Sequence, residues 1–131
     1  MNRVVVDASV LGAVVFAEAE GAAWSERLDG VAVFAPRLLQ YELQSIARKK
    51  CRLRPGEAPA VVEALSRALD HRWGLTLIDP NPADVVLIAN ATGLSAYDAN
   101  YLCLAGMLGA DLLTADRRLA AALDSRAQRS G

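Results

Sequence analysis

The sequence predicts a single α/β domain, residues 1–131, in which helices cover both faces of a central parallel sheet of four to five strands, giving three α/β/α layers. Short apolar runs alternate along the chain with longer stretches of helical character. Hydrophobic residues make up 53% of the chain and aromatic residues only 5%, which favours helices over an aromatic-rich β-sandwich. A chain of 131 residues is long enough to bury one core of its own.

Four short, mainly apolar runs are predicted to be strands, and the first, a continuous run of valines, is expected to be buried on both faces. They are residues 4–6, 31–34, 75–78 and 112–114. Pro36 ends the second run, and a turn rich in proline follows the third. The chain after Leu123 has no apolar run for a fifth strand, and we expect residues 125–131 to form a flexible polar tail.

Helices are predicted where apolar residues recur at spacings of three and four, or where start and stop residues mark the ends. Pro55 and Ser95 each begin a helix, and Gly109 ends the helix that starts at Ser95. The predicted helices are residues 7–17, 21–30, 38–51, 55–69, 82–91, 95–109 and 116–123.

The overall charge limits the kind of partner that the protein binds. A net charge of −1 and an isoelectric point near 5.8 exclude a protein that grips nucleic acid through a global positive field. The two cysteines form neither a CxxC pair nor a zinc spacing. Asp7 interrupts the apolar N-terminal stretch, which argues against a signal peptide, and no stretch approaches the ~20 apolar residues of a membrane span. We therefore expect a cytoplasmic protein without membrane contact.

Four acidic residues lie where the surrounding pattern predicts core: Asp7, Glu42, Asp98 and Asp116. A carboxylate among buried residues is costly unless cations or hydrogen-bond donors compensate it. A single group that stabilises all four carboxylates would explain all four positions. The simplest such group is a divalent cation held by oxygen ligands. The pattern therefore indicates metal-dependent chemistry on phosphate.

Each acid also has an alternative structural role. Asp7 and Asp116 can cap the helices that they precede, and Asp98 can form a capping box with Ser95. Glu42 lies within a helix, where no cap is available, so its alternative is a buried ion pair with an arginine. The joint pattern favours one shared site over four separate explanations.

Other features narrow the chemistry further. The one histidine, His71, excludes a metal-free ribonuclease that uses two histidines as acid and base. No glycine-rich nucleotide-binding motif and no GxSxG nucleophile motif is present. A basic cluster of Arg48, Lys49 and Arg52 is a candidate for contact with RNA phosphates, and its alternative is an ordinary solvated helix end.

Four segments resemble the PIN-domain ribonucleases, specifically the VapC-type toxins of bacterial toxin–antitoxin pairs. They are VVVDAS around Asp7, YEL around Glu42, SAYDANY around Asp98 and LLTADRRLA around Asp116. The resemblance covers almost the whole chain. It departs from the family pattern at Ser45, where the family often has asparagine, and in the tail, where the family often has an apolar edge strand.

The resemblance implies a doubly wound α/β domain in which the four acids gather in one pocket and bind Mg²⁺ or Mn²⁺. It implies that Ser9 and Thr114 are polar residues that support this pocket. It also implies a homodimer and a cognate antitoxin protein that blocks the site.

The sequence thus predicts a Mg²⁺-dependent endoribonuclease toxin that cleaves RNA phosphodiester bonds with a metal-activated water and that an antitoxin inhibits. Asp7 and Asp98 are expected to hold one or two ions, with Glu42 and Asp116 completing the catalytic cluster directly or through water. Two alternatives stay open. One is a PIN-domain nuclease of RNA processing that has no antitoxin, and the other is a non-enzymatic α/β module whose acids bind a basic partner peptide.

Overall fold

The computed structural model describes residues 2–70 and 74–130 and contains the predicted parallel sheet. The strands are β1 (Arg3–Val6), β2 (Ala32–Ala35), β3 (Leu75–Leu77) and β4 (Asp111–Leu113), in the order β3-β2-β1-β4. Every neighbouring pair is parallel. The predicted α/β class is therefore confirmed, and the described residues form four strands. His71 lies outside the described residues.

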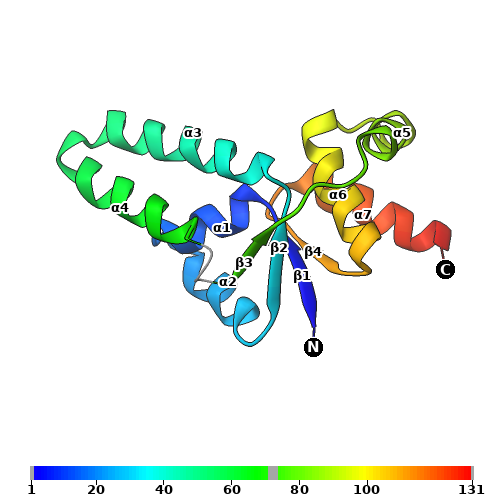
Figure 1. The fold of residues 1–131 in the computed structure, drawn as a ribbon, viewed down its shortest axis with the longest axis horizontal. Coiled ribbons are helices and arrows are strands. Elements are labelled where there is room, and N and C mark those ends of the chain that lie inside the picture. Colours follow the sequence, from blue (N-terminus) through cyan, green and yellow to red (C-terminus); the bar gives the residue numbers. More distant parts are fainter. Residues whose placement is uncertain (1, 71–73, 131) are drawn as a thin grey trace.

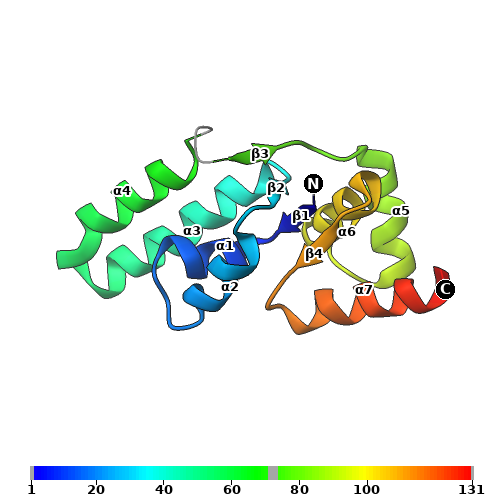
Figure 2. The same ribbon diagram turned by 90° about the horizontal axis from the view of Figure 1, so that it is seen from below.

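Helices connect the strands and form the two outer layers. They are α1 (Ala8–Val15), α2 (Gly21–Leu28), α3 (Leu38–Leu53), α4 (Ala58–Ala68), α5 (Pro82–Thr92), α6 (Ala96–Leu108) and α7 (Arg117–Ser130), with a 3₁₀ turn at Pro55–Glu57. Figures 1 and 2 show α1 to α4 on one side of the sheet and α5 to α7 on the other. Among the described residues, no helix combines the length and the apolar character needed to span a membrane.

Most helix ends lie within two residues of the prediction, and the helix expected from Pro55 begins as the 3₁₀ turn, with α4 starting at Ala58. Two ends have a specific cause. α1 ends at Val15 and is followed by Ala17 in the left-handed region, with a φ of 50°, which turns the chain toward α2. α7 continues past the expected end at Leu123 as far as Ser130. The prediction ended this helix with its last apolar residue. However, the following residues include no glycine or proline before 131, and alanine, arginine and glutamine favour a helix without any apolar contact.

The strand order determines which strand ends meet. The chain adds β2 and β3 on one side of β1 and then returns to place β4 on the other side, so the winding reverses between β1 and β4. In open α/β sheets, ligands bind outside the carboxyl ends of strands at such a reversal. Val6 is paired with Leu113, so the residues that follow, Asp7 and Thr114, leave the sheet side by side.

The core surrounds β1, whose continuous valine run is covered from both faces. Val5 and Val6 are fully buried. Leu39 and Leu43 of α3 and Tyr101 of α6 are buried in the same hydrophobic cluster. The side chains that pack the centre of the molecule therefore belong to the same helices that carry Glu42 and Asp98, which fixes the approach of these helices to the end of β1.

The close contact between α1 and α2 gives a test of this packing. A Cβ added at Gly21 would lie 2.3 Å from the backbone oxygen of Ala13, which cannot move without shifting α1. We expect Gly21→Ala to lower the free energy of unfolding by about 1–3 kcal/mol, as overpacking does. Urea unfolding of the purified protein measures the change.

Gly106, inside α6, is the matched control because a Cβ there meets nothing within 4 Å. We expect Gly106→Ala to raise the free energy of unfolding by about 0.5–1 kcal/mol, because alanine is the better helix former. Equal unfolding midpoints for the two variants would contradict the packing described here.

Candidate active site

The four predicted acids lie at the carboxyl edge of the sheet. Asp7 directly follows β1 and Asp116 lies in the short loop after β4. Glu42 lies in the second turn of α3, and Asp98 in the first turn of α6. Their charges act on one another: Asp7 and Asp98 both affect Glu42, while Asp116 and Asp7 both affect Asp98. The structure therefore brings the four carboxylates into one cluster, which we call the acid cluster.

Asp7 is buried, with only 6% of its surface exposed, and is compensated by three donors. Its Oδ1 accepts hydrogen bonds from Ser9 Oγ at 2.6 Å and from the backbone N–H of Val10 at 3.2 Å. Its Oδ2 accepts a hydrogen bond from the Thr114 hydroxyl. The bond from Val10 is the helix cap of α1, so capping and membership of the acid cluster occur together in this residue.

The two hydroxyls that contact Asp7 are themselves held by the loop after β4. Ser9 Oγ accepts a hydrogen bond from the backbone N–H of Ala115 at 3.0 Å. Thr114 Oγ1 accepts one from the backbone N–H of Asp116 at 2.9 Å. Ser9 and Thr114 therefore orient the Asp7 carboxylate and tie the start of α1 to the loop that carries Asp116.

Glu42 has a tyrosine as its partner. The buried Tyr101 hydroxyl of α6 donates a hydrogen bond to Glu42 Oε1, and among the described residues no arginine forms an ion pair with Glu42. Burial raises the pKa of Glu42, and the charges of Asp7 and Asp98 raise it further, while the hydrogen bond from Tyr101 opposes the shift. The ion pair considered as an alternative is therefore not formed in this part of the structure.

Tyr101 is a residue of the site that the sequence interpretation missed. Its side chain is 1% exposed, and burial, followed by the contact with Glu42, raises the pKa of its hydroxyl. The sequence placed Tyr101 in the apolar stripe of its helix, where most of its ring does lie. The available signal was its position three residues after Asp98, within SAYDANY.

Asp98 combines a cap with a place in the acid cluster. Ser95 Oγ accepts a hydrogen bond from the backbone N–H of Asp98 at 3.1 Å, which caps α6 as predicted. Burial raises the pKa of the Asp98 carboxyl, and the negative charges of Asp116 and Asp7 raise it further. A hydrogen bond between the side chains of Asp98 and Ser95 and the nearby positive charge of Arg118 oppose these effects without cancelling them.

Asp116 is more exposed than its position in the sequence predicts. The expectation that it occupies a core position is wrong, because it lies in the loop beyond β4 with its side chain toward solvent. Its Oδ1 accepts hydrogen bonds from the backbone N–H groups of Arg118 at 2.8 Å and Leu119 at 3.2 Å, so it caps α7. The capping role is again compatible with a place in the acid cluster.

The predicted basic cluster lies away from the acids. Arg48, Lys49 and Arg52 are exposed on α3, which runs outward from the sheet in Figure 1. Ten residues of helix separate Glu42 from Arg52, a rise of about 15 Å. Among the described residues, Arg118 at the start of α7 is the cation whose charge acts on Asp98, and the sequence interpretation did not select it.

The carboxylate oxygens of the acid cluster suit a divalent cation that keeps most of its waters better than one that is surrounded by protein ligands. Among the described residues, no three His, Cys, Asp or Glu side chains stand close enough together to hold one ion jointly. Burial, with the charges of neighbouring acids, raises the pKa values of Glu42 and Asp98, so a nearby cation would favour the ionised form of both carboxylates. Mg²⁺ keeps several of its waters and needs only one or two direct carboxylates, so oxygen donors in this loose arrangement fit it.

Ligands bind at the strand reversal of parallel α/β domains, and acidic side chains there are oxygen ligands that suit a divalent cation. The sequence profile of the PIN domain family matches residues 4–123. The chain therefore belongs to the PIN domain family, a family with a nuclease-type fold whose nucleases typically use divalent metal ions.

A solved structure supports this assignment. The crystal structure of PAE2754 from Pyrobaculum aerophilum is similar to the present fold with a TM-score of 0.72 and 28% sequence identity. The similarity covers 98% of this chain and 96% of that chain. No curated protein matches the sequence significantly.

The raised pKa values predict how stability depends on pH in the metal-free protein. The ordinary values are 4.5 for Glu42 and 3.8 for Asp98, and folding raises both. The folded state therefore binds more protons than the unfolded state between the ordinary and raised values, so stability falls as the pH rises through this range. We expect the melting temperature in EDTA to decrease as the pH rises above these ordinary values and through the raised values of the folded state.

Asp98→Asn tests the origin of this slope because the amide keeps the shape and does not titrate. We expect the variant to reduce the slope, while Asp84→Asn, which changes an exposed acid of α5, keeps the wild-type slope. Thermal melts at several pH values in EDTA measure both. The same slope in wild type and Asp98→Asn would contradict the repulsion described for the acid cluster.

Proposed function

We propose that this protein is a Mg²⁺-dependent endoribonuclease of the VapC type, with Mn²⁺ as an alternative ion. The observation that carries the proposal is the acid cluster: four carboxylates from four separate segments converge at the strand reversal of a PIN domain, and burial together with the charges of neighbouring acids raises the pKa values of Glu42 and Asp98. A fold under no functional constraint would place these charges apart, because their repulsion destabilises it.

Each acid has a role that follows from its surroundings. Asp7, oriented by Ser9 and Thr114, and Asp98, at the start of α6, would hold the ion. Glu42 and Asp116 would complete the cluster directly or through water. When bound, the ion lowers the pKa of a coordinated water and neutralises charge that develops on the phosphate. Tyr101 would hold the Glu42 carboxylate in place through its hydrogen bond to Oε1.

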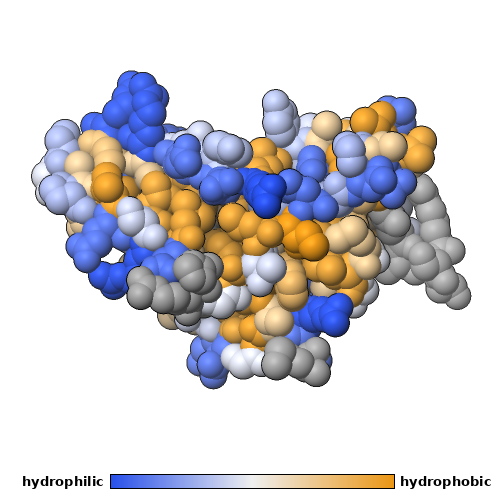
Figure 3. All heavy atoms as spheres, in the orientation of Figure 1, coloured by the Kyte–Doolittle hydropathy of each residue, from blue (hydrophilic) through white to orange (hydrophobic). Residues whose placement is uncertain are grey.

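The exposed apolar surface supports the proposed protein partners, a cognate antitoxin and a second copy of the chain. In Figure 3, hydrophobic residues gather between α3 and α4, over the sheet, and again over α5. Tyr41 of α3 is 59% exposed, and Leu87 of α5 and Tyr97 of α6 are 65% and 67% exposed. Large apolar side chains grouped at a surface are typical of protein interfaces. We assign the α3 side to the antitoxin and the α5–α6 side to the homodimer.

The activity is tested with purified protein and single-stranded RNA. We expect cleavage with Mg²⁺ or Mn²⁺, none in EDTA, and products with a 5′-phosphate, because a water attacks phosphorus directly. We expect Asp98→Asn to reduce the cleavage rate at least about a hundredfold while the protein stays folded. Electrophoresis of end-labelled RNA and circular dichroism measure the two effects.

Asp84→Asn is the matched control for charge and should cleave at the wild-type rate. Induced expression tests the toxin role in the same variants: wild type should arrest growth, and Asp98→Asn should not. Cleavage by Asp98→Asn at the wild-type rate would remove this acid from the site, and products with a 2′,3′-cyclic phosphate would rule out direct attack by water.

Tyr101→Phe tests the support of Glu42, since it removes the hydroxyl and keeps the buried ring. Without the donor, Glu42 is free to turn away from the cluster, and we expect the apparent affinity for Mn²⁺ to fall about tenfold, as when other partners of metal ligands are removed. The rise in melting temperature with increasing Mn²⁺ measures this affinity without reference to activity.

Tyr97→Phe is the control on the same helix, because it also removes a tyrosine hydroxyl but at an exposed position. In a Glu42→Gln background, Tyr101→Phe should have little further effect on the Mn²⁺ affinity, because Tyr101 acts through the Glu42 carboxylate. Equal Mn²⁺ affinities for Tyr101→Phe and Tyr97→Phe would show that the hydrogen bond contributes nothing to the site.

A further inference from the structure

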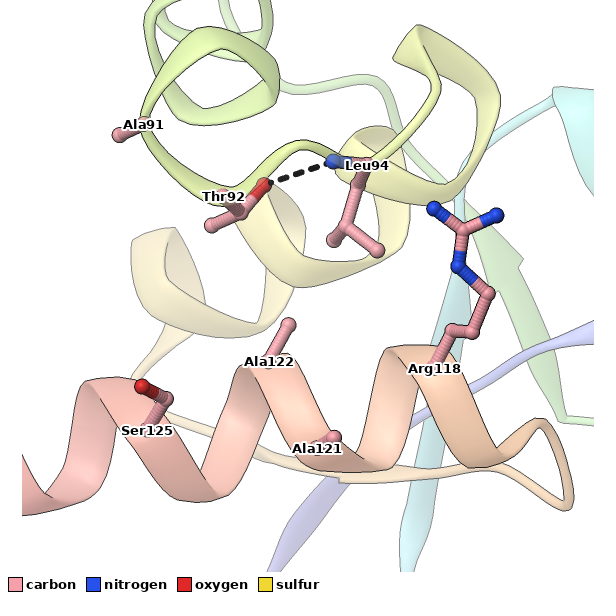
Figure 4. A pocket seen from close by; sticks show the side chains of 7 residues that line it. All are labelled: Ala91, Thr92, Leu94, Arg118, Ala121, Ala122 and Ser125. Carbon is pink, nitrogen blue, oxygen red and sulfur yellow. Dashed lines mark hydrogen bonds between the residues drawn. The ribbon is translucent and has the colours of Figure 1, made fainter.

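A cavity of about 350 Å³ lies beside the acid cluster, between the end of α5, the loop before α6 and the first turns of α7. Figure 4 shows its walls: small side chains of α7 form one side, and Leu94 and Thr92 lie opposite them. The volume is within the range of small-molecule binding sites. The residues that line it are Ala91, Thr92, Leu94, Arg118, Ala121, Ala122 and Ser125.

Arg118 joins this cavity to the acid cluster. Its side chain rises from α7 beside Leu94 at one end of the cavity in Figure 4. Its charge also acts on Asp98, which no other cation is found to do among the described residues. The backbone N–H of Arg118 is bonded to Asp116 Oδ1, so the cap of α7 fixes the position from which the side chain extends.

The charges explain why a nuclease needs this arginine. RNA carries a phosphate at every nucleotide, and the four carboxylates of the acid cluster repel it even when one divalent ion is bound. The bases Arg48, Lys49 and Arg52 lie six to ten residues beyond Glu42 on α3, and they are not among the charges that act on Glu42 or Asp98. Arg118 is placed to offset this repulsion, and a guanidinium binds a phosphate through two parallel hydrogen bonds.

We propose that the cavity is a subsite for the nucleotide next to the scissile phosphate of RNA, and that Arg118 binds the phosphate of that nucleotide. The alanine and leucine side chains offer an apolar wall to the face of the base, which tolerates different bases, and the hydroxyls of Thr92 and Ser125 line the same cavity. The subsite thus favours an unpaired strand, because a base within a duplex cannot enter it. This inference rests on the proposed ribonuclease function.

Arg118→Ala tests the phosphate contact in EDTA, where cleavage is absent and binding alone is observed. We expect the affinity for a short fluorescent single-stranded RNA to fall about tenfold, and the slope of affinity against salt concentration to fall by about one. Arg117→Ala, the neighbouring exposed arginine that does not line the cavity, should change the affinity by less than about twofold. Arg118→Lys should recover part of the affinity, since it restores the charge without the planar donors.

Ala121→Leu tests the cavity itself by filling it from an exposed position on α7. We expect this variant to change the nucleotide preferred on one side of the cleaved bond in an RNA of randomised sequence, while Mn²⁺ still raises its melting temperature as in wild type. An unchanged preference would overturn the subsite.

Equal RNA affinities for Arg118→Ala and Arg117→Ala would overturn the phosphate contact. A wild-type protein that neither binds nor cleaves RNA would instead refute the proposed function, and this inference with it.

Discussion

The site depends on one buried carboxylate, that of Asp7, and on the hydrogen bonds that make its burial tolerable. Ser9 and Thr114 donate to its two oxygens, and both hydroxyls accept from the backbone of the loop after β4. The same bonds that satisfy the charge therefore fix the end of β1, the start of α1 and the loop before α7 relative to one another. Without them, a charge 6% exposed at the edge of the valine core would destabilise the fold.

Capping and clustering, which compete as explanations when only the sequence is read, have the same physical basis. Asp7, Asp98 and Asp116 each lie at the start of a helix, where unpaired N–H groups and the helix dipole favour negative charge. α1 and α7 begin close together because they follow the neighbouring parallel strands β1 and β4, whereas α6 follows α5 and brings Asp98 within reach of the charges of Asp7 and Asp116. The backbone thus supplies part of the compensation for the acid cluster. Burial and the charges of neighbouring acids still raise the pKa values of Glu42 and Asp98, and a bound cation would oppose both effects.

The parts of the structure that follow from local pattern could be predicted, and the parts that depend on side-chain environment could not. A few neighbouring residues determine the valine run of β1, the helix start at Pro55 and the helix cap at Ser95. The strand and helices that they predict are present. The exposure of Asp116 could not be read from the apolar run before it, since exposure depends on where the loop leaves the sheet. The pairing of Tyr101 with Glu42 joins residues 59 positions apart and depends on how α3 and α6 pack across β1.

Glu42 differs from the other three acids, and the difference explains why a tyrosine is needed. It lies in the second turn of α3, beyond the unpaired N–H groups at the start of that helix, so the backbone offers it no donor. Its compensation has to come from a side chain on a facing element. A cation there would neutralise the charge and compete with a metal ion, whereas a phenol donates one hydrogen bond and leaves the carboxylate negative. Tyr101 meets this requirement from within the core, because its ring packs as a hydrophobic residue and only its hydroxyl reaches the acid cluster.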